Sequence, residues 1–220
     1  MSRLLRLRAR LVFGLMVFCL GVGAAAGQEP TVRGDVELWQ MPAGRYRLDV
    51  EHTHVYWQVS HAGFSMTQGR FNRFEGGLDL RPGALSQSEL VATVFLDSVD
   101  TNVAELDQVL RSDSMFDVER HSVAIFTLNG LDGVGPGQAI ATGVLEMNGT
   151  AAPVELEVTL NRARITRDPR FTRMGVTARG VIDRMTWGLD LFPEIIGHDV
   201  VIVIDAEFLL DIPPEQGEEP

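Results

Sequence analysis

Apolar and polar residues alternate with a period of two through much of the chain between residues 45 and 211. The stretches 55–60, 78–81 and 154–160 show this pattern most clearly. Successive side chains of a β-strand point to opposite faces, so the alternation predicts strands with one buried face. Such a chain must pair its strands into a sheet and cover the apolar face of that sheet.

The alternating stretches are separated by Gly, Pro, Asn and Asp, which are typical of turns. About eight strands are predicted, at 55–60, 78–81, 90–96, 124–128, 144–147, 154–160, 176–183 and 200–210. We expect a loop at 129–138 and a tight turn at Asn148-Gly149. Regular short strands without a repeat or linker predict one antiparallel barrel or sandwich over residues 45–211.

One segment has the periodicity of a helix instead of a strand. Within residues 102–118, apolar residues recur at the spacing of one helix face. We expect Asp100, Thr101 or Asn102 to cap the N-terminus of this helix. A short helix that follows a barrel strand can cover one end of the barrel as a lid.

The N-terminus has the residue order of a secretory signal. Residues 1–10 contain four Arg and no acidic residue, residues 11–26 are uncharged, and Ala24 and Ala26 offer small side chains to a signal peptidase. The apolar run is shorter than the roughly 20 residues that span a bilayer. We therefore expect cleavage after residue 26 and a periplasmic or secreted product. An uncleaved anchor and lipidation at Cys19 are the alternatives.

The composition fits an exported protein and disfavours one class of partner. The 220 residues include 19 basic residues, all of them Arg, and 30 acidic residues, so the net charge of -11 becomes -15 once residues 1–26 are removed. Such an acidic chain is a poor partner for nucleic acid. The single cysteine lies in the predicted signal, so the mature chain has none to form a disulfide. Residues 27–44 and 212–220 are expected to be a flexible lead-in and a disordered acidic tail.

Two histidines are the strongest candidates for a metal site. His52 and His54 are two residues apart, so a strand would place both on one face, where they could bind one ion. That site would need a third ligand such as Asp49, Glu51 or His198. Hydrogen bonding at the start of a strand is the simpler explanation, so we predict no metal and no other cofactor.

Motifs of catalysis are not found in the sequence. It contains no Gly-x-Ser-x-Gly elbow, and its glycine-rich turns lack the strand-to-helix context and the Lys of phosphate-binding loops. The carboxylates are numerous but have no diagnostic spacing. The residues therefore give little support to nucleophilic or acid–base catalysis.

Aromatic residues and Met are concentrated in the predicted strands and helix. In a sandwich these side chains would form a solid core, whereas an eight-stranded barrel can hold one small ligand. An apolar lumen would favour a long apolar molecule whose head is bound by a few polar groups. The residues alone leave core and lumen as open alternatives.

Four motifs in order resemble those of the YceI-like family. They lie at residues 45–77, 98–118, 143–158 and 182–189. The first has the family pattern "D..H(S/T)" at Asp49, His52 and Thr53, and the last resembles "inRsdfGl" through Arg184 and Trp187. Together they extend over nearly all of residues 46–211, so their order and spacing make the resemblance specific.

The resemblance implies an all-β fold, an eight-stranded antiparallel lipocalin-like barrel with a short helical lid. It also implies an exported protein that encloses polyisoprenoid chains or related lipids without catalysis. We therefore predict that a long-chain isoprenoid or fatty-acyl ligand is held in an apolar lumen for carriage or storage. No nucleic acid partner and no stable membrane insertion after cleavage are expected, and a homodimer is left open. The alternatives are a His-dependent metal-binding enzyme and a structural or stress-related envelope protein with a filled core.

The predicted ligand contacts combine apolar side chains with two polar ones. They are His61, Phe71, Phe74, Val94, Leu110, Phe116, Phe126, Arg184 and Trp187. Most are expected to line the lumen, with Phe116 closing the lid. His61 and Arg184 are expected to reach the ligand head.

Both polar contacts have structural alternatives. His61 could instead make an internal hydrogen bond, and Arg184 could pair with Asp107 or Asp183. Leu106 stands where the family often has Arg, which removes one partner for an anionic head. A neutral isoprenoid or fatty amide is therefore favoured over a pyrophosphate.

Overall fold

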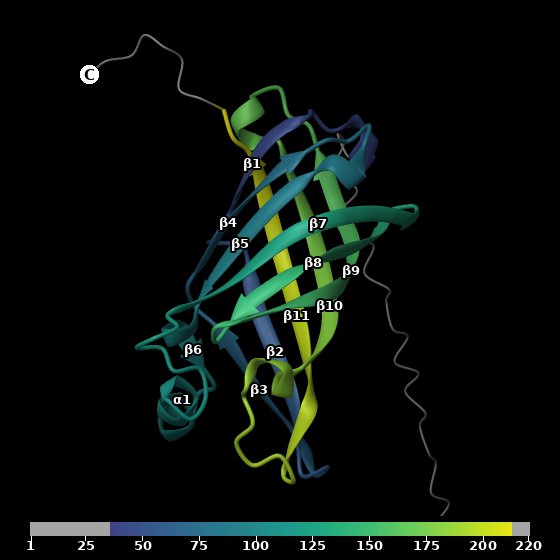
Figure 1. Ribbon diagram of the computed structural model, residues 1–220. Coiled ribbons are helices and arrows are strands. Elements are labelled where there is room, and N and C mark those ends of the chain that lie inside the picture. The colour runs from purple at the N-terminus through teal and green to yellow at the C-terminus, as the bar shows by residue number, and fades with distance from the viewer. Residues whose placement is uncertain (1–35, 213–220) are drawn as a thin grey trace, which may run out of the picture. The chain divides into compact units, whose positions relative to one another are not determined.

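Residues 36–212 are described by the structure, a computed structural model, and they form an antiparallel β-barrel with one α-helix at one end (Figure 1). The strands are β1 (Gly44–Leu48), β2 (His54–His61), β3 (Ser65–Phe71), β4 (Phe74–Leu80), β5 (Glu89–Phe95), β6 (Val99–Asp100), β7 (Val123–Gly135), β8 (Gln138–Met147), β9 (Thr150–Arg164), β10 (Arg173–Asp183) and β11 (Ile196–Leu210). The helix α1 is Ala104–Arg111. Short 3-10 helices are η1 (Leu38–Gln40), η2 (Leu85–Gln87), η3 (Leu96–Ser98), η4 (Pro169–Phe171) and η5 (Arg184–Trp187).

Eight strands close into a ring. Their order is β1-β4-β5-β7-β8-β9-β10-β11, and β11 pairs with β1 through Tyr46 and Leu210. Every pairing in the ring is antiparallel. The predicted eight-stranded antiparallel barrel is therefore confirmed, and the sandwich alternative is wrong.

The wall extends beyond the ring at the end that carries α1. β2 pairs with the first part of β11, from Ile196 to Asp205, while β1 pairs with its last residues. β3 pairs with β2, and the short β6 pairs with Arg70 and Phe71 of β3. α1 follows β6 directly and packs against it, so this extension places the helix across one end of the barrel (Figure 1).

The expected loop at 129–138 is mostly a strand. β7 continues to Gly135 and pairs with β8 through Gly130, Asp132 and Gly133, with two register shifts. Glycines hide this strand from a search for alternation, because they have no side chain to place on either face. The expected turn at Asn148-Gly149 is confirmed, with φ values of 53° and 76° that suit a two-residue hairpin turn.

The segment expected to be a flexible lead-in is packed against the barrel where it is described. The Val36 amide donates to the Ala163 carbonyl at 2.9 Å. Met41 is buried in a cluster with Tyr46 and Phe208, and Leu38 packs against that cluster. Its apolar residues explain this packing, because they bury apolar surface against the barrel wall.

The predictions for the two ends of the chain lie outside the described residues. They concern the signal at 1–26, the lead-in as far as residue 35 and the acidic tail from residue 213 onward. Within residues 36–212, no helix combines the length and the apolar composition needed to cross a bilayer.

Candidate functional site

A cavity of about 680 Å³ lies inside the barrel. Strands on all sides contribute inward-facing apolar residues to its wall, among them Leu78, Leu90, Leu156, Val176 and Ile204. Ala92, Ala141 and Ala178 also line it. Such small side chains leave space in the lumen that larger ones would fill, so this barrel encloses a chamber.

The cavity reaches the surface at one end, which we call the mouth. The mouth is formed by Glu37 and Trp39 of the η1 segment, Leu85 of η2 and the β7–β8 turn at Pro136 and Gly137. The Trp39 side chain lines the cavity and is still 70% exposed, so solvent and ligand can meet the lumen there.

The opposite end is filled by packed side chains. Leu96, Met147 and Ile182 line the cavity and are themselves buried. They belong to a core cluster that also contains Leu110 of α1 and Phe116. We call this end the closed end.

Four of the nine predicted contacts line the cavity: Phe71, Phe74, Val94 and Phe126. Gly143 on β8 makes room for the Phe126 ring, because a Cβ there would lie 2.5 Å from two ring carbons. Val94 and Phe126 belong to strands that the alternation predicted, whereas Phe71 and Phe74 lie outside those ranges. The contact of all four side chains with a ligand stays a prediction.

Three other predicted contacts lie beneath the lumen in the packing of the closed end, and the expectation that they line it needs correction. The ring of Phe116 packs against Phe71 with centroids 5.8 Å apart. Trp187 is buried and donates from Nε1 to the Leu145 carbonyl at 3.2 Å. Leu110 is buried in the same cluster. Their apolar character was visible in the sequence, but their depth along the barrel axis was not.

Arg184 is buried and faces backbone carbonyls, so it neither reaches the lumen nor pairs with Asp107 or Asp183. Nε donates to the Gly197 carbonyl at 2.8 Å, Nη2 to that of Ile196 at 2.9 Å, and Nη1 to that of Leu189. Desolvation lowers its pKa from the ordinary value, and the charges of Asp190 and Asp183 oppose that change. The guanidinium thus holds the η5–β11 connection in place.

The structure does not bring His52 and His54 together as the paired ligands that the metal alternative required. His61 is exposed at the end of β2 and lies outside the lining of the cavity, and the His54 ring contacts Tyr56. His52 instead meets Asp49, with Nδ1 and Oδ2 3.0 Å apart. The ligand atoms of Asp49, His52 and Glu207 lie within 4.8 Å of one another.

Asp49, His52 and Glu207 lie close together because hydrogen bonds hold the connection between β1 and β2 against β11. The Glu51 amide donates to the Asp49 carboxylate at 3.3 Å, and the Glu207 amide donates to Thr53 Oγ1 at 3.2 Å. Glu207 also pairs with Arg173 at 3.2 Å. The side chains therefore have partners within the protein.

A family model described as a YceI-like domain matches residues 46–208. The chain belongs to the YceI-like family. A UPF0312 protein of Pectobacterium atrosepticum is 35% identical over 170 residues, which cover 75% of this chain and 86% of that protein. With a UPF0312 protein of Shewanella denitrificans the identity is 32% over 117 residues, 52% of this chain, and the chain spans only 61% of that relative's length.

Solved structures of low sequence identity share the YceI-like fold. BcnA of Burkholderia cenocepacia matches with a TM-score of 0.66 and 18% identity, over 73% of this chain and 98% of that one. A polyisoprenoid binding domain from Saccharophagus degradans, implicated in plant cell wall breakdown, matches with a TM-score of 0.58 and 19% identity, over 76% of this chain and 98% of that one.

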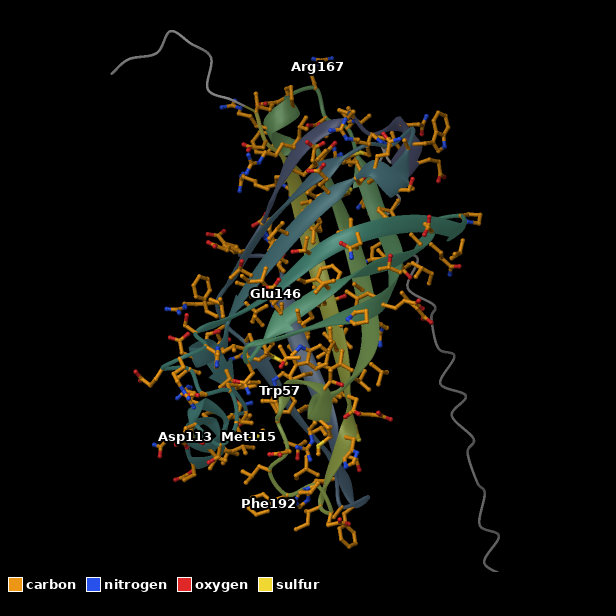
Figure 2. The ribbon with its side chains drawn as sticks, in the orientation of Figure 1. Trp57, Asp113, Met115, Glu146, Arg167 and Phe192 are labelled. Carbon is orange, nitrogen blue, oxygen red and sulfur yellow. The ribbon has the colours of Figure 1, made fainter. Side chains whose placement is uncertain are left out.

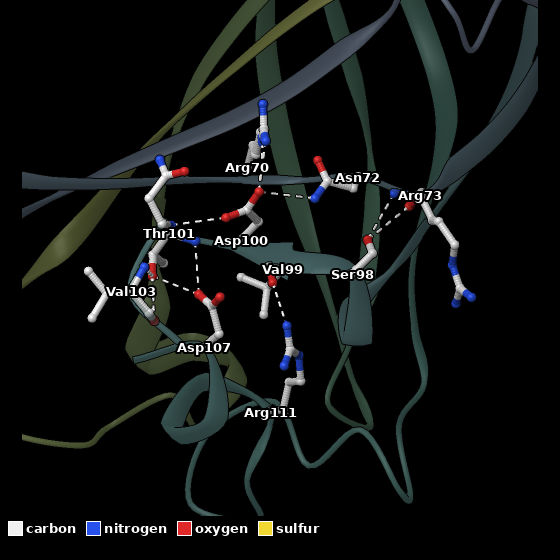
Figure 3. Close-up of polar contacts among 11 residues, drawn as sticks. Arg70, Asn72, Arg73, Ser98, Val99, Asp100, Thr101, Val103, Asp107 and Arg111 are labelled. Carbon is white, nitrogen blue, oxygen red and sulfur yellow. Dashed lines mark hydrogen bonds and ion pairs between the residues drawn. The ribbon is translucent and has the colours of Figure 1, made fainter. Parts of the chain in front are cut away.

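The second YceI-like motif, at residues 98–118, fastens α1 to the wall (Figure 3). Asp107 Oδ1 accepts hydrogen bonds from the Thr101 amide at 2.8 Å and from Thr101 Oγ1 at 2.6 Å. Arg111 donates to the carbonyls of Asp97 and Val99 at 2.9 and 2.8 Å. The expected cap is wrong in detail, because the N-cap position is occupied by Val103, which has no capping side chain.

Around this YceI-like motif, Asp100 connects three segments. Its Oδ2 accepts from Arg70 at 2.8 Å and from Asn72 at 3.2 Å, and its Oδ1 accepts from the Asn102 amide at 2.9 Å. The hydrogen bond from the Asn102 amide contributes most to lowering the pKa of this carboxyl, and those from Arg70 and Asn72 add to it. Together they lower the pKa of Asp100 to about 2. The base of the lid is thus held by charged hydrogen bonds.

Sequence reasoning missed the mouth of this YceI-like barrel. Glu37 and Trp39 precede the matched domain and lay in the expected lead-in, where no alternation marks them. Gln138 was assigned to a loop. A single Trp in an otherwise polar segment was the one feature of the sequence that could have pointed to a mouth formed by these residues.

Proposed function

We propose that the protein is an exported lipid-binding protein that encloses a polyisoprenoid or similar long-chain amphiphile for carriage or storage. The apolar cavity of about 680 Å³, open at the mouth, is the observation that carries this proposal. Transfer of an apolar chain into it gains about 0.8 kcal/mol for each buried methylene. The likeness to a domain described as polyisoprenoid binding supports the ligand class.

We further propose a neutral head group, such as that of a neutral isoprenoid or a fatty amide. Among the described residues, those with charged side chains that line the cavity are Glu37 and Glu75, and both are acidic. A pyrophosphate head would be repelled by these carboxylates. Arg184, the cation that the sequence offered as its partner, is occupied by backbone carbonyls.

The two rival functions fit the structure less well. A structural protein with a filled core predicts no chamber, whereas this barrel has one. A His-dependent enzyme would draw on His52, His54 and His61, but only His52 lies in the group with Asp49 and Glu207. Metal analysis separates these functions, because stoichiometric zinc that is lost in His52→Ala would favour the enzyme.

Native mass spectrometry tests the lipid proposal directly. Protein purified from a bacterial periplasm should carry an extractable long-chain lipid, and the delipidated protein should take up a polyprenol more tightly than the matching polyprenyl diphosphate. A protein that carries no lipid and takes up neither compound would contradict lipid binding. Tighter binding of the diphosphate would contradict only the neutral head.

Two matched substitutions locate the bound lipid. Ala141→Phe places a ring in the cavity and should abolish uptake of the polyprenol. Ala151→Phe adds the same ring at an exposed position on β9 and should leave uptake unchanged. Equal uptake by the two variants would place the lipid outside the lumen.

Export is tested by the intact mass of the secreted product. We propose that residues 1–26 are removed and that the mature protein resides in the periplasm or outside the cell. The mass should equal that of residues 27–220. A full-length product retained in membranes would overturn this part of the proposal.

A further inference from the structure

The β9–β10 connection concentrates positive charge in an acidic protein. Residues 162–173 contain five Arg and one acidic residue, Asp168, while the whole chain has a net charge of -11. We call residues 162–173 the basic loop. Among its arginines, Arg162, Arg167 and Arg170 are exposed.

The basic loop lies at the mouth end of the barrel. Leu160 and Met174, which flank the loop, both line the cavity. The Ala163 carbonyl accepts a hydrogen bond from Val36, just before the segment with Trp39. Figure 1 shows the connection in green at the end opposite α1, and Figure 2 places Arg167 far from Asp113 and Phe192.

Exposed apolar side chains lie within and beside this charge. Phe171 is 56% exposed and Ile165 is 39% exposed, both within the basic loop, and the exposed Trp39 stands at the mouth. Aromatic side chains next to Arg are typical of surfaces that enter the headgroup region of a bilayer. A purely ionic partner would leave these apolar surfaces in water.

Among the described residues, Arg170 and Arg173 of the basic loop have carboxylate partners, whereas Arg167 has none. Asp168 accepts from Arg170 at 2.7 Å, and Glu207 pairs with Arg173 at 3.2 Å. The strand register nevertheless places Arg164 directly opposite Arg173. Like charges opposite each other destabilise a sheet, and an anionic partner would remove that cost.

We propose that the basic loop docks the protein reversibly on a bilayer that contains anionic phospholipid, with the mouth facing the membrane. Arg side chains bind the phosphate headgroups, while Phe171 and Ile165 enter the interface between headgroups and acyl chains. A ligand could then pass between bilayer and lumen without crossing water. The docking rests on charge and exposed apolar surface, so it holds whether or not the lumen carries a lipid.

Vesicle co-sedimentation of the full chain provides the test. The protein should bind vesicles of phosphatidylglycerol and phosphatidylcholine more tightly than phosphatidylcholine alone, and added salt should weaken binding. Arg167→Gln should reduce partitioning about fivefold, because an arginine near such a surface contributes about 1 kcal/mol. Arg179→Gln removes the same charge from an exposed position on β10 and should have no comparable effect.

A second pair of variants tests the apolar contact. Phe171→Ser should weaken binding to the mixed vesicles. Phe64→Ser removes a ring that is 91% exposed at the β2–β3 turn, which lies at the opposite end, and should leave binding unchanged. Thermal unfolding of each variant confirms that it is folded.

Three outcomes would overturn docking through the basic loop. Equal partitioning of all variants would assign binding to another part of the chain, such as the apolar residues 11–26 that all variants share. Equal binding to vesicles without anionic lipid would remove the role of charge. Complete displacement by duplex DNA, with no effect of Phe171→Ser, would indicate a general polyanion site.

Discussion

A buried guanidinium organises the loop that closes the barrel opposite the mouth. Arg184 is 3% exposed and donates to the carbonyls of Leu189, Ile196 and Gly197. Leu189 lies in the connection before β11, and Ile196 and Gly197 begin β11, where its pairing with β2 shifts register. The side chain therefore supplies hydrogen bonds that a helix or sheet would otherwise provide.

Arg184→Leu should lower the free energy of unfolding by about 2–4 kcal/mol, because it leaves buried carbonyls without donors. Urea unfolding followed by circular dichroism measures the change. Arg179→Leu is the control, because Arg179 is exposed on β10, the strand that precedes η5. It should change the free energy of unfolding by less than about 0.5 kcal/mol. Equal losses in the two variants would contradict the role of the three carbonyls.

Tyr46 gives the protein a pH dependence in the alkaline range. The residue is fully buried and its hydroxyl donates to the Pro42 carbonyl at 2.8 Å. Burial raises the pKa of Tyr46 to about 12. The folded state thus retains the proton more strongly than the unfolded state, whose Tyr has a pKa of about 10.

The stability that comes from this retained proton is complete below pH 10 and is lost as the pH rises toward 12. Tyr46→Phe should therefore be less stable near neutral pH, because it lacks the bond to Pro42, but its stability should fall less between pH 10 and 12. Thermal unfolding across this range measures both effects. Parallel curves for the two proteins would show that Tyr46 does not titrate as proposed.

At the scale of elements, α1 is held by polar contacts at both of its ends and not by its length. The helix has only 8 residues, too few to be stable alone in water. Thr101 and Arg111 connect its two ends to the strand that precedes it. The lid should therefore respond to single polar substitutions.

Asp107→Ala should destabilise the protein by about 1 kcal/mol, the usual cost of losing a helix-capping interaction. Hydrogen exchange should quicken in the amides of α1 while the barrel strands keep their protection. Glu105→Ala removes an exposed carboxylate from the same turn and is the matched control. Faster exchange in both variants would show that negative charge near the helix N-terminus stabilises α1, and that the hydrogen bond between Asp107 and Thr101 does not.

Alternation in the sequence predicted the elements whose two faces differ. β9 has one face toward the lumen and one toward water, so its residues carry the period of two. The glycine-rich end of β7 and the largely exposed β3 do not meet that condition, and neither was predicted as a strand. The cap at Val103 was missed because Thr101 bonds to Asp107 across the turn instead of occupying the N-cap position.

At the scale of the whole molecule, the sequence predicted which side chains face inward but not which depth they occupy. Phe71 and Phe126 line the chamber, whereas Phe116 and Trp187, from motifs of equal strength, fill the closed end. Depth depends on the tilt and closure of the barrel, which arise from pairings between distant strands. The position of the basic loop could not be predicted for the same reason. Its arginines are visible in the sequence, but only the closure of the barrel places them at the mouth.

A lipid bound in the chamber, as we propose, should add to the stability of the folded molecule. A ligand that binds only the folded state at 100 times its Kd adds about 2.7 kcal/mol. For a domain of about 150–250 residues this corresponds to a rise in Tm of about 5–10 °C. Removal of lipid by organic extraction should therefore lower Tm by that amount, and added polyprenol should restore it.

Ala141→Phe separates this effect from nonspecific stabilisation by lipid. The ring occupies the space that the ligand would take, so the variant should have the same Tm with and without polyprenol, as measured by differential scanning calorimetry. Ala151→Phe, on the outer face, should keep the full shift. If Ala141→Phe also gained 5–10 °C, the lipid would be stabilising the outer surface, and the chamber would have no role in binding.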